Sequence, residues 1–253
     1  MTLPDHTATL STGRRVDLPL RCEADVVGAL FSADQRSLRG AVPEALTPVR
    51  VGPRRGVVVV VGVSYSQAGD FDPYDELAVI VPVARRTVAG VPRLDGGLGG
   101  YVVSLPVTTE ESRRMGREIW GYPKTVADVE IRRESVADGG DEWHVDVREG
   151  GRDDDGCDGG DGTLALSLSV RETGRRPTRE GTLDSYTVKE DRLWRTPVDV
   201  LGPVGLGLGG KNVSLSLERG RLAEDVRRLD VGRPLGRFTG RVRAHVQAGS
   251  AVE

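Results

Sequence analysis

The stretch Gly56–Tyr65 reads GVVVVVGVSY, and it decides the class of fold that we expect. β-Branched valines favour extended backbone, and an unbroken apolar run of this length is typical of a strand buried on both faces. The runs Glu76–Val83 (ELAVIVPV) and Tyr101–Leu105 (YVVSL) have the same character. The sequence therefore predicts three buried strands in this part of the chain.

Elsewhere apolar and polar residues alternate with a period of two. This alternation is typical of antiparallel strands with one face on a core and the other in water. The alternating segments are Ala127–Ile131, Trp143–Val147, Leu164–Val170, Val213–Leu217 and Phe238–Val246. We expect each of them to be a strand.

Helices are few in this sequence. Asp34–Leu46 favours a short helix that stops before Pro43, because the residue before a proline disfavours helical backbone. Thr108–Trp120 is the strongest helix candidate, with Thr108 and Glu111 spaced as a capping box. Ala223–Leu229 is a third candidate. Strands and helices do not alternate regularly, so the sequence predicts a mainly antiparallel β fold with a few helices (α+β), barrel-like or cone-like.

Length and composition narrow the functional classes. The 253 residues fit one domain over 1–253, in which we expect residues 1–20 to be poorly ordered. A net charge of −3 gives no support for a nucleic-acid or polybasic membrane binder, and no apolar run is long enough to span a bilayer. Cys22 and Cys157 form neither a disulfide framework nor a zinc motif. We expect a cytoplasmic protein without a cofactor.

Two glycine-rich segments each have two interpretations. Glu149–Gly162 (EGGRDDDGCDGGDG) has carboxylates suited to calcium, but its spacing matches no EF-hand loop, so we favour a mobile hairpin loop over 149–162. Gly205, Gly207 and Gly210 have the dinucleotide-binding spacing. That motif needs a helix after it, whereas Lys211–Glu218 alternates like a strand, so we favour a loop or a glycine-lined wall.

Lysine is rare in this chain: Lys124, Lys189 and Lys211 are the only three among 35 basic residues. Lysine can act as an amine nucleophile, whereas arginine stays protonated. Lys124 follows Trp120-Gly-Tyr122-Pro, where a helix should end and Pro123 stiffens the backbone. An amine buried between these aromatic residues would lose water, which disfavours the ammonium and leaves free amine to attack a carbonyl. On the pattern alone we favour the alternative, a lysine at the start of a strand whose head reaches solvent.

The segment Gly116–Lys124, GREIWGYPK, resembles the signature of the acetoacetate decarboxylase family, whose lysine forms a Schiff base with a keto acid. Val42–Leu46 (VPEAL) resembles an early segment of that family, and Tyr74-Asp75-Glu76 resembles its Y-x-E stretch. The resemblance extends from about Val26 to Val246. It implies an acetoacetate decarboxylase-like fold, with Lys124 as the Schiff-base lysine and Glu76 as the active-site carboxylate.

The resemblance also implies a substrate-binding set with weaker support. Its members are Tyr74, Tyr122, Trp120, Tyr65 and Arg21. The family's arginine near the substrate carboxylate falls on Ala24 when counted without gaps, and a gap in the alignment would bring Arg21 there. A second lysine follows the first in the decarboxylases themselves, and here that position is Thr125.

We therefore expect a Schiff-base lyase acting on a small oxo acid, by decarboxylation or by dehydration, aldol or cyclisation chemistry. The differences at Thr125 and Ala24 weigh slightly against acetoacetate itself. The alternative is a non-catalytic β-barrel that binds a small molecule in the same pocket, and a third possibility is that the lysine segment serves subunit packing. The resemblance also implies a homo-oligomer, with no nucleic-acid or membrane partner.

Overall fold

The structure is a computed structural model that describes residues 6–85, 87–88, 91–92, 99–137, 139–150, 162–174 and 176–252. Its helices are α1 (Gln35–Ala41), α2 (Glu110–Trp120) and α3 (Arg221–Arg228). Its strands are β1 (His6–Thr9), β2 (Arg15–Leu18), β3 (Leu20–Asp34), β4 (Thr47–Pro48), β5 (Arg55–Ala68), β6 (Tyr74–Ala84), β7 (Thr87–Val88), β8 (Val91–Pro92), β9 (Gly99–Val107), β10 (Lys124–Val126), β11 (Asp128–Ser135), β12 (Asp141–Glu149), β13 (Thr163–Arg171), β14 (Thr178–Lys189), β15 (Arg192–Leu208), β16 (Val213–Leu217), β17 (Val231–Val246) and β18 (Ser250–Ala251).

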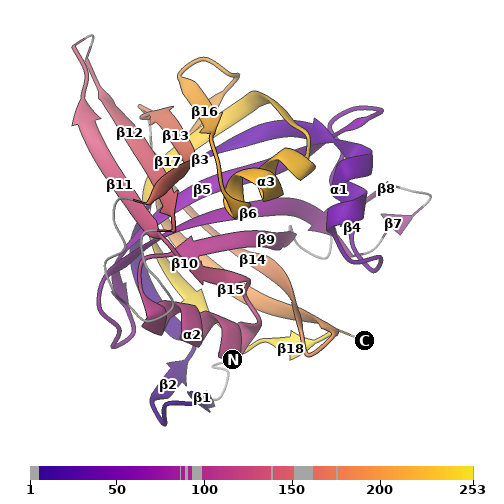
Figure 1. Cartoon of the computed structure of the whole chain (residues 1–253), viewed down its shortest axis with the longest axis vertical. Coiled ribbons are helices and arrows are strands. Elements are labelled where there is room, and N and C mark those ends of the chain that lie inside the picture. Colours follow the sequence, from indigo (N-terminus) through magenta and orange to yellow (C-terminus); the bar gives the residue numbers. More distant parts are fainter. Residues whose placement is uncertain are drawn as a thin grey trace.

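The main sheet closes into a barrel. Its strands follow the order β9-β14-β15-β17-β3-β5-β6, and β6 pairs with β9 to complete a seven-stranded circle. The pairings are antiparallel except those of β9 with β14 and with β10. The long strands β3, β5, β15 and β17 curve around the barrel (Figure 1). The expected mainly antiparallel barrel with a few helices is confirmed.

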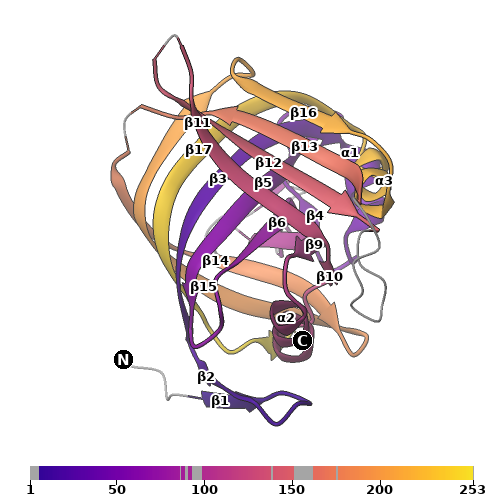
Figure 2. The same ribbon diagram turned by 60° about the vertical axis from the view of Figure 1, so that its left-hand side comes forward.

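A second sheet, in the order β11-β12-β13-β16, lies across the outer face of the barrel (Figure 2). Val58 and Val60 of β5 share one apolar core with Val145 and Leu168 of this sheet. At Gly62 a Cβ would lie only 2.8 Å from a methyl group of Val145, so glycine lets the two sheets approach closely. This packing buries the outer face of β5.

The inner face of β5 carries the alternate residues. Val59, Val61 and Val63 belong to a separate apolar cluster that includes Ala78 of β6 and Val102 of β9. Since successive side chains point to opposite faces of a strand, the valine run supplies both cores at once. The expectation of a strand buried on both faces is confirmed for β5.

The helices lie close to where the sequence predicts them. Asp34 caps α1, because its carboxylate accepts hydrogen bonds from the backbone N–H groups of Arg36 and Ser37, both at 2.9 Å. The expected capping box of Thr108 and Glu111 is wrong by one residue. Thr109 is extended and its hydroxyl accepts from the N–H of Ser112, whereas the hydroxyl of Thr108 accepts from the N–H of Asp75.

The structure decides between the two interpretations for one of the glycine-rich segments. Gly205 and Gly207 lie inside β15, paired with β17, so the dinucleotide motif is excluded and the glycines belong to a wall of the barrel. Residues 151–161 lie outside the described residues, and the mobile loop over 149–162 stays a prediction. Within the expected poorly ordered residues 1–20, β1 and β2 form a hairpin. In the described part of the chain, no helix is long and apolar enough to cross a membrane.

Candidate active site

The turn that precedes Lys124 follows from its sequence. Helix α2 ends at Gly121, which adopts a left-handed conformation (φ 68°) that glycine tolerates best. The N–H groups of Gly121 and Tyr122 bond back to the carbonyls of Arg117 and Gly116, which completes the helix end. Lys124 then begins β10 and pairs with Leu105 of β9. The motif thus brings the lysine from the end of a helix directly into the barrel.

The amine of Lys124 is buried and paired. Its side chain is 4% exposed, and Nζ lies 3.0 Å from Oε2 of Glu76, whose side chain is 9% exposed. Glu76 is the third residue of β6, on the same face as Ala78. The structure therefore brings together the two residues that the family resemblance assigns to catalysis. It also overturns the alternative in which the amine reaches solvent.

Gly116 of α2 makes room for the stem of this lysine. A Cβ on Gly116 would lie 2.6 Å from Cδ and 2.7 Å from Cε of Lys124, closer than carbon atoms pack. The glycine five residues before the turn is thus a packing requirement of the site. The sequence motif contains this glycine, but its contact with the lysine was not apparent from the sequence.

Two tyrosines lie against the ion pair, Tyr65 at the carboxylate and Tyr74 beside the amine. The Tyr65 hydroxyl donates a hydrogen bond to Oε1 of Glu76 at 3.0 Å. The Tyr65 ring stacks on Tyr74 with centroids 4.6 Å apart, and Nζ of Lys124 lies 5.0 Å from the centroid of Tyr74. This cation–π distance is within the favourable range. Oε1 of Glu76 therefore accepts from Tyr65, and Oε2 faces the amine of Lys124.

Burial keeps the phenols of the site protonated. The pKa values of Tyr65 and Tyr74 are raised well above the usual value, first by burial and then by the charge of Glu76. Burial likewise raises the pKa of Tyr122 to about 12, against a hydrogen bond to Ser185 that lowers it. These tyrosines are consequently hydrogen-bond donors at neutral pH.

Trp120 is buried beside Tyr122 at the end of α2. It is 2% exposed, its ring centroid lies 5.9 Å from that of Tyr122, and its Nε1 donates to the carbonyl of Gln247 at 2.9 Å. The indole N–H is thus already satisfied by the protein. Trp120 fixes Tyr122 and the end of α2 beside the lysine.

Cys22 is a member of the site that the sequence interpretation missed. Its side chain is buried, and its thiol pKa is raised to about 12 by burial and by Glu76, against an opposing effect of Lys124. It lies on β3 among residues that alternate buried and exposed, with Leu20 and Ala24 buried like itself. That alternation indicates the inner face of the barrel, but a lone cysteine forms no motif that marks it as a site residue.

Arg21 is not part of this cluster. It is exposed, whereas Leu20 and Cys22 on either side of it are buried, so Arg21 lies on the opposite face of β3. The suggested substitution of Arg21 for the family arginine is therefore corrected. Among the described residues, Lys124 is the one buried cation.

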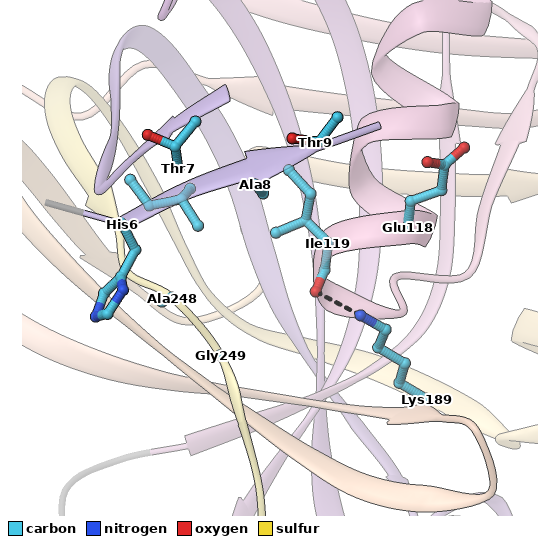
Figure 3. Close-up of a pocket in the computed structure, with 10 residues that line it drawn as sticks. His6, Thr7, Ala8, Thr9, Glu118, Ile119, Lys189, Ala248 and Gly249 are labelled. Carbon is cyan, nitrogen blue, oxygen red and sulfur yellow. Dashed lines mark hydrogen bonds between the residues drawn. The ribbon is translucent and has the colours of Figure 1, made fainter. Parts of the chain in front are cut away.

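A separate cavity of about 420 Å³ lies outside this cluster, between the N-terminal hairpin and the end of α2 (Figure 3). His6 and Thr7 of β1 line it from one side, and Ile119 and Lys189 from another. Nζ of Lys189 donates to the carbonyl of Ile119 at 3.1 Å, and also lies 5.0 Å from the ring centroid of Trp194. Lys189 therefore stabilises the C-terminal end of α2, as a cation does at a helix C-terminus.

The fold and the buried Lys124–Glu76 pair define a closed β-barrel with a lysine–carboxylate site at one end. The family model for acetoacetate decarboxylase (ADC) matches residues 3–154, a range that contains both residues of the pair. The chain belongs to the acetoacetate decarboxylase family.

Solved structures of similar fold agree with this assignment. The enduracididine biosynthesis enzyme MppR, solved in complex with pyruvate, is 14% identical with a TM-score of 0.68, and the match covers 99% of each chain. Acetoacetate decarboxylase from Legionella pneumophila is 18% identical with a TM-score of 0.65, over 100% of this chain and 92% of that one. An acetoacetate decarboxylase-like enzyme from Sphingomonas wittichii is 17% identical with a TM-score of 0.61, over 98% of this chain and 100% of that one. Comparison with curated proteins finds no match.

Proposed function

We propose that this protein is a lyase that forms a Schiff base between Lys124 and a small oxo acid. The observation that carries the proposal is the amine of Lys124, held inside the barrel 3.0 Å from the carboxylate of Glu76. A buried lysine next to a group that can take its proton is what amine catalysis on a carbonyl requires. MppR, a protein of the same fold, has been solved with pyruvate, which supports an oxo acid as the substrate class.

In the proposed reaction, Glu76 first accepts a proton from the ammonium of Lys124. The free amine adds to the ketone carbon, and the resulting carbinolamine loses its hydroxyl group as water, with Glu76 returning the proton. The iminium then accepts the electron pair of the bond that breaks on the neighbouring carbon: carbon dioxide or an aldehyde leaves, or the carboxylate of Glu76 takes up the proton. The enamine is protonated at carbon, and water hydrolyses the imine to release the product.

The neighbours of the pair fit these steps. Tyr65 holds one oxygen of Glu76 and leaves the other toward the amine, so the carboxylate is oriented for proton transfer. The protonated phenols of Tyr74 and Tyr122 can donate hydrogen bonds to a carbonyl or carboxylate. The lack of a second lysine at Thr125 and the exposure of Arg21 remove two features of acetoacetate recognition, so we favour an oxo acid other than acetoacetate.

The test is reductive trapping. The protein is incubated with pyruvate, 2-oxobutanoate or acetoacetate, treated with borohydride, and digested for mass spectrometry. We expect an adduct on the peptide that contains Lys124 and its loss in Lys124→Met, with the exposed Lys211 supplying a matched control, Lys211→Met, that keeps the adduct. Absence of any adduct on Lys124 across such a panel overturns the proposal. Carbon dioxide release from acetoacetate separates a decarboxylase from the other branches.

The non-catalytic binding protein is the second candidate, and the ion pair itself favours it. A carboxylate at 3.0 Å stabilises the charged ammonium, which is not a nucleophile. In that case oxo acids would bind reversibly, with a measurable affinity in calorimetry that Lys124→Met weakens, and borohydride would trap nothing.

A further inference from the structure

The strand pairings place three rows of residues on the inner face of the barrel, beginning at the lysine–carboxylate pair. Residues paired across neighbouring strands point to the same face, so each row can be followed through the register. The first row is Glu76, Val63, Val26, Gly240 and Val204. The second is Ala78, Val61, Gly28, Phe238 and Leu206, and the third is Ile80, Val59, Leu30, Gly236 and Leu208.

Glu76 is the only charged residue in these three rows, and no other member has a polar side chain. Six of them belong to or pack against the apolar cluster of the inner face, namely Val59, Val61, Val63, Ala78, Ile80 and Phe238. Gly28 allows the ring of Phe238 to lie flat against β3, since a Cβ there would lie 2.5 Å from the ring. We name these rows the inner apolar wall. Along β6 it extends four residues from Glu76 to Ile80, about 13 Å at about 3.3 Å per residue.

The wall is open to solvent at its far end. Leu206 is 56% exposed and Leu208 is 94% exposed. Large exposed apolar side chains grouped on a concave face indicate a binding surface. Here they form the rim of a wall that leads to the reacting amine.

We propose that the inner apolar wall binds the apolar chain of the substrate, so that the protein acts on oxo acids with an extended alkyl or aryl substituent. This inference rests on the proposed function for the position of the oxo acid head. The ketone carbon lies at the amine of Lys124, and the chain extends over Val61 and Phe238 toward Leu206. A short acid such as pyruvate leaves Leu206 and Leu208 in contact with water, whereas a longer chain covers them.

The experiment uses the full chain and two series of ligands. Octanoate and butyrate have no ketone and cannot form an imine, so calorimetry with them tests the wall independently of the chemistry. Each methylene removed from water contributes about a fourfold gain in affinity. We expect octanoate to bind at least about tenfold more tightly than butyrate. We also expect 2-oxooctanoate to be trapped on Lys124 at lower concentrations than pyruvate.

Matched variants test whether the gain in octanoate affinity comes from the inner apolar wall. Leu206→Gln and Leu208→Gln should each weaken octanoate binding by about tenfold and lower the ratio of 2-oxooctanoate to pyruvate trapping. Val188→Gln is the control, because Val188 is 43% exposed but lies on the same face of β14 as Tyr186, outside the barrel. It should leave octanoate affinity unchanged.

The outcomes separate the two proposals. If octanoate binds no better than butyrate, or if Val188→Gln weakens it as much as Leu206→Gln, the wall is not the chain site. If Leu206→Gln changes the mass in light scattering and leaves octanoate affinity intact, the wall is a contact between copies and the inference is overturned. If no oxo acid is trapped but octanoate binding depends on Leu206, the Schiff-base function fails and the apolar chain site stands.

Discussion

Replacing Gly116 by alanine tests whether helix α2 holds the stem of Lys124 in place. In the middle of a helix, alanine is more stable than glycine by about 0.5–1 kcal/mol. The new Cβ, however, would lie 2.6 Å from Cδ and 2.7 Å from Cε of Lys124, whose Nζ is held by Glu76 at 3.0 Å. Because the side chain is fixed at both ends, it cannot move aside freely. Overpacking of such a site costs about 1–3 kcal/mol.

The expected result for Gly116→Ala is therefore a net loss of about 1 kcal/mol in the free energy of unfolding. Gly40 of α1 supplies a matched control, since a Cβ there has no atom within 4 Å. Gly40→Ala should leave stability unchanged or raise it by up to about 1 kcal/mol. Urea unfolding followed by circular dichroism measures both variants under the same conditions.

Trapping of an oxo acid on Lys124 gives a functional measurement for the same two variants, Gly116→Ala and Gly40→Ala. A displacement of about 1 Å of a reacting group can reduce a rate by about a hundredfold, so borohydride trapping on Lys124 should fall at least about tenfold in Gly116→Ala. It should be unaffected in Gly40→Ala. If both glycine variants gain stability and trap equally well, the contact between α2 and the lysine does not constrain the site, and the reasoning is refuted.

Three further predictions concern the groups around the lysine. Glu76→Leu leaves the buried ammonium of Lys124 unpaired and should lower the free energy of unfolding by about 3–5 kcal/mol. The double variant Glu76→Leu with Lys124→Met should lose far less, because neither charge remains. Losses that simply add in urea unfolding would contradict the pairing. Tyr65→Phe keeps the ring stacking but removes the hydrogen bond to Glu76, and should lower the free energy of urea unfolding by about 1.5–3 kcal/mol. Tyr101→Phe on the outer face is the control and should have a small effect. The thiol pKa of Cys22 rises from 9.0 to about 12 on folding, so the unfolded chain loses this proton first and stability falls between about pH 9 and pH 12. Cys22→Ala should lessen that fall by at most about 1.4 kcal/mol per pH unit. Urea unfolding of both proteins at about pH 8 and about pH 10 measures it, and an equal fall in the two proteins would show that the thiol pKa is not raised.

Much of the fold was predictable because it depends on local patterns. The valine run of β5, the alternation in β11 to β13 and the stop of α1 before Pro43 each reflect backbone preferences or a two-residue period. The cap of α2 was displaced by one residue, from Thr108 to Thr109. The reason is that Thr108 bonds to Asp75 of a distant strand, a competition that no local pattern contains.

In the candidate site, too, some features follow from the local sequence and others from the fold. The sequence by itself determined that Lys124 follows a helix, a left-handed glycine and a proline, because those residues restrict the backbone directly around it. Only the tertiary structure decided that its amine meets Glu76, that Cys22 faces the pair and that Arg21 points away. These contacts depend on the register of β3, β5 and β6 around the closed barrel. A shift of one residue in that register would move every side chain to the opposite face, and a linear pattern does not specify it.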